Sequence, residues 1–145
     1  MFDKNINVAH LQEISKNTMV EYLGIEFLEL GDNFISAKMP VDHRTHQPMG
    51  LLHGGASLVL AETLGSVAST ILVDMNKFHC VGLEINANHV KSIRNGFVIG
   101  KAIPIHLGKK THVWDIRITN ETGDLICISR LTVAVIEKNS SSKQI

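Results

Sequence analysis

The sequence has few cysteines and no excess of charge of either sign, and each shortage narrows the class of protein. Its 145 residues include two cysteines, Cys80 and Cys127, which are far apart and form no CxxC pair. Both lie in apolar, strand-like runs, so we expect reduced, buried thiols. Lys plus Arg and Asp plus Glu both number 14, giving a formal charge of zero. No net field attracts nucleic acid or an anionic membrane, and phosphate binding would need a local cluster of cations.

The sequence also has few features of a secreted or membrane-spanning protein. The first ten residues, MFDKNINVAH, are acidic and polar where a signal peptide needs a basic start and an apolar stretch, so we expect a cytosolic protein. Residues 58–75 are nearly apolar, but four polar residues interrupt them within a single potential span: Glu62, Ser66, Ser69 and Asp74. This segment is therefore predicted to be a buried helix and not a membrane span.

The bulk composition is that of one soluble globular domain. Hydrophobic residues make up 44% of the chain and charged residues 19%, values typical of folded soluble proteins. A chain of this length is the size of a single domain with one core. We expect that domain over residues 1–138 and a disordered tail over 139–145, where three serines stand in a row.

Hydrophobic periodicity predicts the elements of an α+β fold. Helical spacing covers residues 8–23 and, with apolar or small residues on most faces, residues 53–75. Strand patterns cover residues 25–30, 34–39, 80–90, 97–106, 111–119 and 125–137. The turn Gly31-Asp32-Asn33 predicts a hairpin between the first two strands, and short polar turns predict an antiparallel meander of the last four. We expect a curved antiparallel sheet wrapped around one long apolar helix.

A polar loop leading into the long helix carries the residues of chemical interest. Gly54 and Gly55 stand at the helix start, where backbone N–H groups lack helical partners and glycine lets a ligand oxygen approach, as an oxyanion hole requires. Glu62 follows two turns later on a helix that otherwise avoids charge, so we expect a carboxylate in a pocket. The alternative is that Glu62 lies on a solvent-exposed surface of the helix or forms an ion pair with a lysine. Together with Glu62, Ser66 and Ser69 form a polar stripe along the helix, which predicts a cavity lined by these side chains.

Two other kinds of site have weaker support in the sequence. Ser57 is a rival nucleophile, but its surroundings lack the second glycine of a GxSxG elbow and no strand directly precedes it. His43, His46 and His53 are candidate metal ligands, yet the first two lie in a loop and not on a helix. We expect solvent-exposed loop histidines.

Several motifs together resemble the hotdog-fold thioesterases, over a stretch from about residue 19 to residue 136. They are Met39-Pro-Val-Asp42, Gln47-Pro-Met-Gly-Leu-Leu-His-Gly-Gly-Ala-Ser57, Leu60-Ala-Glu62 and Gly82-Leu-Glu-Ile-Asn-Ala-Asn-His89. Within that family the motifs are most similar to those of small bacterial enzymes that hydrolyse 1,4-dihydroxy-2-naphthoyl-CoA in menaquinone synthesis, and to the proofreading thioesterase of enterobactin synthesis. The resemblance implies a hotdog fold and hydrolysis of an acyl-CoA, with an aromatic acyl group favoured.

The resemblance also implies roles for single residues. Glu62 would be the nucleophile or general base, and the Gly54 N–H would polarise the thioester carbonyl. Gln47 and His53 would position the thioester and the attacking water, and Ser66 would line the acyl pocket. In this family the glutamate faces the glutamine and glycine of a neighbouring subunit, which implies a homo-oligomer, expected as a dimer of dimers. The chemistry needs no metal or redox cofactor.

By the same resemblance, CoA would lie along two further stretches of the chain. The implied contacts are Gly82, His89, Val90, Lys91, Ser92, His106, Leu107, Gly108, Lys109, Lys110 and Thr111. The three lysines would form the local cation cluster that a neutral protein needs for phosphates. A solvated, lysine-rich turn is the alternative for residues 109 and 110.

Two other functions remain open at the level of sequence. One is a hotdog hydratase or dehydratase, because His43-Arg-Thr-His46 superficially resembles a dehydratase loop, although a carboxylate nine residues after a His-Gly-Gly turn fits hydrolysis better. The other is an acyl-CoA-binding module without catalysis. Sequence does not choose between attack by Glu62 itself, through an anhydride, and attack by a water that Glu62 deprotonates.

Overall fold

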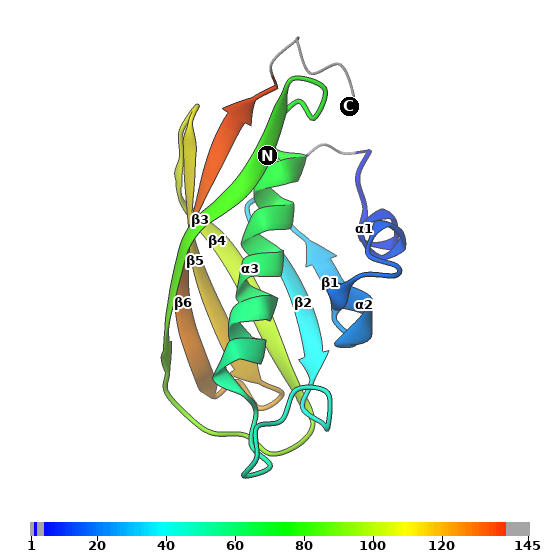
Figure 1. Ribbon diagram of the computed structural model, residues 1–145, viewed down its shortest axis with the longest axis vertical. Coiled ribbons are helices and arrows are strands. Elements are labelled where there is room, and N and C mark those ends of the chain that lie inside the picture. The colour runs from blue at the N-terminus through cyan, green and yellow to red at the C-terminus, as the bar shows by residue number, and fades with distance from the viewer. Residues whose placement is uncertain (1, 3–4, 139–145) are drawn as a thin grey trace.

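The computed structural model describes residue 2 and residues 5–138, so the predicted disordered tail over 139–145 lies outside the described residues. Within them the fold is α+β, as predicted, with a long helix against a six-stranded antiparallel sheet (Figure 1). The elements are α1 (Val8–Ile14), α2 (Met19–Tyr22), β1 (Glu26–Leu30), β2 (Ile35–Pro40), α3 (Gly54–Ile71), β3 (Phe78–His89), β4 (Phe97–Leu107), β5 (Thr111–Asn120) and β6 (Leu125–Glu137).

The predicted N-terminal helix over residues 8–23 is broken into α1 and α2. Asn17 adopts a left-handed backbone conformation (φ 59°), which ends helical hydrogen bonding. Thr18 then caps the second helix, because its hydroxyl accepts a hydrogen bond from the Val20 N–H. The prediction of one continuous helix was wrong, because a polar Ser-Lys-Asn-Thr run offers the backbone these local partners.

The sheet order is β1-β2-β4-β5-β6-β3, which corrects the predicted meander of the last four strands. Strands β4, β5 and β6 do follow one another, but β3 pairs with β6 and forms an edge of the sheet. The connection from β3 to β4 is no tight turn. It runs past the start of α3, where the Leu52 N–H donates to the Ile93 carbonyl (2.8 Å), so β4 enters the sheet beside β2.

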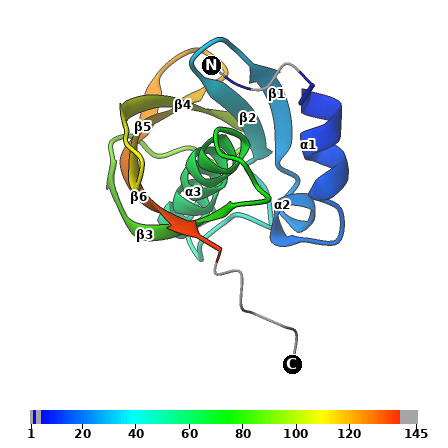
Figure 2. The ribbon, with the colours of Figure 1, turned by 90° about the horizontal axis from the view of Figure 1, so that it is seen from above.

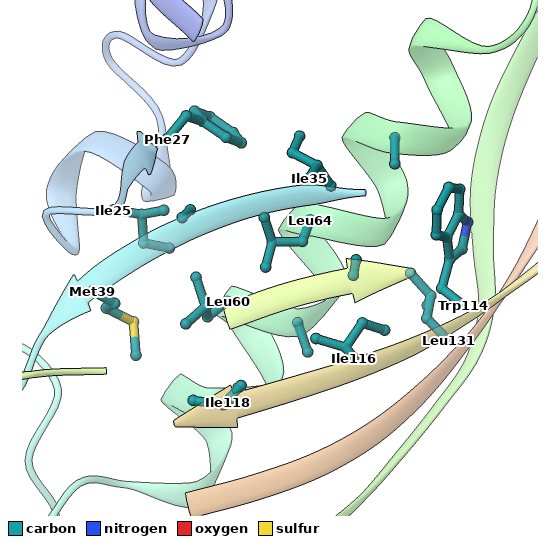
Figure 3. Packing of buried hydrophobic residues seen from close by; sticks show 14 of the residues in the cluster. Ile25, Phe27, Ile35, Met39, Leu60, Leu64, Trp114, Ile116, Ile118 and Leu131 are labelled. Atoms are coloured by element: carbon teal, nitrogen blue, oxygen red, sulfur yellow. The ribbon is translucent and has the colours of Figure 1, made fainter. Parts of the chain in front are cut away.

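Helix α3 lies in the hollow of the curved sheet, and α1 and α2 lie beside β1 (Figure 2). The inner face of α3 buries Leu60, Leu64 and Ala68, spaced by four residues, against the sheet. Figure 3 shows Trp114 and Leu131 packed beside the helix. The core packs against the inner face of α3, which fixes the positions of the polar residues that the helix carries.

Both cysteines are free thiols, as predicted, and Cys127 is buried while Cys80 is half-buried. Burial raises the pKa of each thiol. Among the described residues, no helix is both long and apolar enough to span a membrane.

Candidate functional site

The loop before α3 is held in place by its own hydrogen bonds. The Gln47 N–H donates to the Leu51 carbonyl at 2.8 Å, and the Gln47 side-chain oxygen accepts from the Met49 N–H. The Gln47 amide therefore has its oxygen occupied, and its NH₂ group remains as a donor. Arg94 also holds this loop, because its Nη1 donates to the Met49 carbonyl at 3.0 Å.

The start of α3 presents a backbone donor, as the sequence predicted. His53 is the N-cap, and its Nδ1 accepts from the Gly55 N–H at 2.8 Å. The Gly54 N–H has no acceptor among the described residues. A Cβ at residue 54 would lie 2.6 Å from His89 Nε2, so any larger residue there would displace the imidazole. The His89 imidazole thus lies against the start of α3 at Gly54.

A cavity of about 300 Å³ joins these groups. Its lining residues come from the loop, the start of α3, the end of β3 and β6: Gln47, Leu51, Leu52, Gly54, Ser57, His89, Val90, Lys91, Ser92, Ile93 and Ile126. Six of the residues assigned by resemblance therefore line a single cavity, although they come from two separate stretches of the chain.

Glu62 is exposed in the single chain, which corrects the expectation of a carboxylate buried on a wrapped helix. The sheet ends at β3 on this side of α3, so no further strand covers the helix. The carboxylate lies against that edge, since a Cβ at Gly82 would lie 2.6 Å from Glu62 Oε1. No ion pair of Glu62 occurs among the described residues, so of the two alternatives considered for Glu62 the single chain shows the exposed helix surface and not the pair with a lysine.

The two serines after Glu62 have different surroundings and do not form one stripe along a cavity. Ser66 lines an apolar cavity of about 180 Å³ between α1 and α3. Ser69 is fully buried in the core, where its hydroxyl accepts a hydrogen bond from Trp114 Nε1 at 2.8 Å. The expected polar stripe along a cavity was wrong at Ser69, because the sheet covers this part of the helix and the Ser69 hydroxyl is bonded to Trp114 in the core.

The predicted cluster of three lysines does not form within one chain. The Lys91 N–H bonds to the Ile126 carbonyl near the start of β6, whereas the Val135 N–H bonds to the Lys110 carbonyl near its end. Ile126 and Val135 are nine residues apart on β6, which is about 30 Å along the strand. Lys91 forms an ion pair with Asp124 (2.6 Å), which also removes it from a free cluster.

The second group of predicted CoA contacts lies at the β4–β5 turn. His106 and Leu107 end β4, and Thr111 begins β5. Gly108, Lys109 and Lys110 line a cavity of about 700 Å³ near the C-terminal end of α3. This turn and the cavity at Gly54 thus belong to opposite ends of the long helix (Figure 1).

The loop histidines are held by single contacts. His43 is exposed, and His46 Nε2 lies 2.8 Å from the Arg94 carbonyl oxygen. Within residue 2 and residues 5–138, no group of three or more His, Cys, Asp or Glu side chains could hold a metal ion. Sequence reasoning missed Arg94, because an arginine beside an Asn-Gly turn carries no local sign that it anchors a loop far away in sequence.

A helix wrapped by a curved antiparallel sheet, with a polar cavity at the helix start, defines the hotdog-fold class of enzymes. The model of the thioesterase superfamily matches residues 49–127 of the chain. The chain belongs to this family, and it is a thioesterase.

Related proteins match nearly the whole chain. A 1,4-dihydroxy-2-naphthoyl-CoA hydrolase of Escherichia coli is 48% identical over 136 residues, covering 94% of this chain and 99% of the relative. The proofreading thioesterase EntH of Cronobacter turicensis is 46% identical, covering 94% and 98%. The crystal structure of a mutant thioesterase of Pseudomonas aeruginosa superimposes with a TM-score of 0.92 at 50% identity, covering 94% of this chain and 99% of that one.

Proposed function

We propose that this chain hydrolyses acyl-CoA thioesters at a site shared between two copies, with Glu62 from one copy and Gln47 and Gly54 from the other. The observation that supports this proposal most directly is the spacing of Gly54 and Glu62 on α3. Residues eight apart on a helix are separated by about 12 Å along its axis. A carboxylate and an oxyanion donor must each come within about 3 Å of one thioester carbonyl. Glu62 and Gly54 of a single chain therefore cannot serve the same substrate.

The free edge of β3 supports this second copy. Among the described residues β3 pairs only with β6, and its apolar side chains Val81 and Leu83 are 41% and 63% exposed. A long edge strand with exposed apolar groups is a template for pairing with another chain. Antiparallel pairing of β3 with the same strand of a second copy would bury these groups and extend the sheet.

Two contacts within the chain support a particular register for that pairing. Gly82 lies against Glu62, and His89 lies against Gly54. A two-fold axis that crosses β3 midway between Gly82 and His89 sets Gly82 opposite His89 of the partner subunit. Glu62 then comes beside Gly54 of the partner subunit, and each dimer has two such sites.

In the composite site, the thioester oxygen lies at the Gly54 N–H, with the Gln47 amide as a second donor. Glu62, or a water that it deprotonates, attacks the carbonyl carbon; the C–S bond then breaks, and the CoA thiolate leaves and takes up a proton. If Glu62 attacks directly, water then hydrolyses the anhydride, which releases the acid and restores the carboxylate. Such a backbone donor contributes about 3–4 kcal/mol in the transition state. Because His53 Nδ1 accepts from the Gly55 N–H, Nε2 carries the ring proton and can orient a water.

The cavity beside Ser66 supports an aromatic acyl group. It measures about 180 Å³, begins one turn beyond Glu62 and is lined mostly by apolar side chains of α1 and α3. An apolar cavity of about 150 Å³ binds benzene, so this volume suits one ring or a compact pair of rings. The E. coli relative acts on a dihydroxynaphthoyl thioester, and the same class of substrate is proposed here.

The separation of the lysines supports a second copy at the CoA site. Lys91 lines the cavity at Gly54, while Lys109 and Lys110 lie about 30 Å away along β6 in the same chain. One CoA molecule can meet both groups only if they come from different copies. The proposed phosphate contacts of Lys109 and Lys110 are therefore made across a subunit interface.

Release of CoA thiol tests the proposed activity. Purified protein should release free thiol from benzoyl-CoA or 1,4-dihydroxy-2-naphthoyl-CoA faster than from medium- and long-chain acyl-CoAs. Glu62→Gln should lower kcat at least about 100-fold with an unchanged circular dichroism spectrum. Hydration of an unsaturated acyl-CoA without thiol release would indicate a hydratase, and tight binding without turnover would indicate a binding module. A variant that keeps more than about a tenth of the turnover would exclude Glu62.

A further inference from the structure

Ser57 is a buried serine whose hydroxyl has no partner. The residue is 1% exposed, and no described residue accepts from or donates to its side-chain oxygen. It lines the cavity of about 300 Å³ that also contains Gln47 and Gly54. Among the described residues, the only completely enclosed side-chain N or O atom without a partner is His112 Nδ1, so the Ser57 oxygen reaches the cavity and is not sealed in the core.

A second buried serine on the same helix shows the usual arrangement. Ser69 is fully buried, and its hydroxyl accepts from Trp114 Nε1 at 2.8 Å. Ser57 and Ser69 thus have similar burial on one helix and differ in whether the hydroxyl is satisfied within the protein. The Ser57 hydroxyl is the one that remains available inside a cavity.

The position of Ser57 on α3 places its side chain on the same helix face as Gly54. Residues three apart on a helix are neighbours on one face, and helical side chains lean toward the N-terminal end. Ser57 therefore projects over the first turn, where the Gly54 N–H also lacks an acceptor. Together with the Gln47 amide, three hydrogen-bond donors line a single cavity.

We propose that Ser57 is a further catalytic residue, whose O–H donates a hydrogen bond to the thioester carbonyl oxygen beside the Gly54 N–H. This inference rests on the proposed thioester hydrolysis. As the carbonyl becomes tetrahedral its oxygen gains charge and accepts up to three hydrogen bonds, so a third donor strengthens as the transition state forms. Ser57 keeps its proton throughout and forms no covalent bond. Glu62 or its water remains the attacking group.

The test compares Ser57→Ala with the matched variant Ser69→Ala. Ser57→Ala removes a hydroxyl without a protein partner, so the melting temperature should stay the same or rise, while kcat for acyl-CoA falls about 10- to 100-fold. Ser69→Ala leaves the indole N–H of Trp114 unpaired, so the melting temperature should fall while kcat of the folded enzyme is unchanged. Opposite effects of the two variants on stability and turnover separate a catalytic hydroxyl from a structural one.

Each other outcome overturns a definite statement. Wild-type protein that releases no CoA from any acyl-CoA overturns the proposed function itself. In another outcome, the wild type is active and the Glu62→Gln variant inactive, while the Ser57→Ala variant keeps a kcat within twofold of the wild type. That result overturns only the role of Ser57. A Ser57→Ala variant that loses stability as Ser69→Ala does would make the hydroxyl structural. An acyl group found on Ser57 by mass spectrometry after rapid quenching would make it a nucleophile and overturn its role as a donor.

Discussion

Glu62 Oε1 lies against the backbone of Gly82, so closely that a methyl group added at residue 82 would lie 2.6 Å from that oxygen. The contact links the middle of α3 to the free edge of the sheet. It holds the proposed catalytic carboxylate at the place where β3 would pair with a second copy. A side chain at residue 82 would therefore compete with the carboxylate for this position.

Gly82→Ala should therefore move the carboxylate and lower kcat. A displacement of about 1 Å in a reacting group can reduce the rate about 100-fold, so we expect a loss of about 10- to 100-fold. The KM for acyl-CoA should change less. Thermal melting and size-exclusion chromatography would show whether the fold and the oligomer persist. Wild-type kcat in a correctly assembled variant would contradict the assigned position of Glu62.

Mixed subunits test the shared site. Gln47→Ala and Glu62→Ala proteins, each nearly inactive, are unfolded and refolded together in equal amounts. About half of the dimers should be mixed, and half of their sites intact, which gives roughly one quarter of wild-type activity. The wild type refolded alone provides the control. If both groups came from one chain, no intact site could form and the mixture would stay inactive.

Replacing Lys109 and Lys110 by alanine should chiefly raise the KM for acyl-CoA. The change removes charge from the proposed phosphate contacts, so a pantetheine thioester, which lacks the nucleotide phosphates, should be affected less. Lys16→Ala removes an exposed lysine that pairs with Glu13 and lines none of the three cavities described above, and it serves as the control. Equal losses with both substrates would mean that the two lysines act in some other way.

Asp42 should make the loop before α3 sensitive to acid. Hydrogen bonds from the Arg44 side chain hold the pKa of Asp42 at about 2. Because the folded pKa lies below the usual value of about 3.8, the ionised group stabilises the fold fully above about pH 4, and the contribution is lost as pH falls toward about 2. Asp42→Asn should lower the free energy of unfolding by about 1 kcal/mol at pH 7, a small value because the pair is partly exposed.

Urea unfolding at several pH values would check this prediction. The difference between wild type and Asp42→Asn should be constant from pH 7 to about 4 and should shrink below that. A difference that persists undiminished at pH 3 would show that the ionised carboxylate is not its source.

Local sequence patterns predicted most of the elements. The strand expected over residues 125–137 is β6, with the same bounds, and the turn Gly31-Asp32-Asn33 does join β1 to β2. The helix start at residue 54 was also predictable, although the helix ends at Ile71 and not near residue 75. These features depend on residues a few positions apart, so their periodicity and turn chemistry are visible in the sequence.

The sequence by itself determined a single α+β fold of known family type, with Gly54 at a helix start and Glu62 two turns later. Only the tertiary structure decided that β3 lies at the sheet edge, that Glu62 is exposed in one chain and that Lys91 is far from Lys109. Strand pairing depends on where a connection crosses the molecule and on which faces are buried, and no local pattern contains that information. The open side of α3 follows from this pairing, because the sheet ends where β3 has no further neighbour among the described residues.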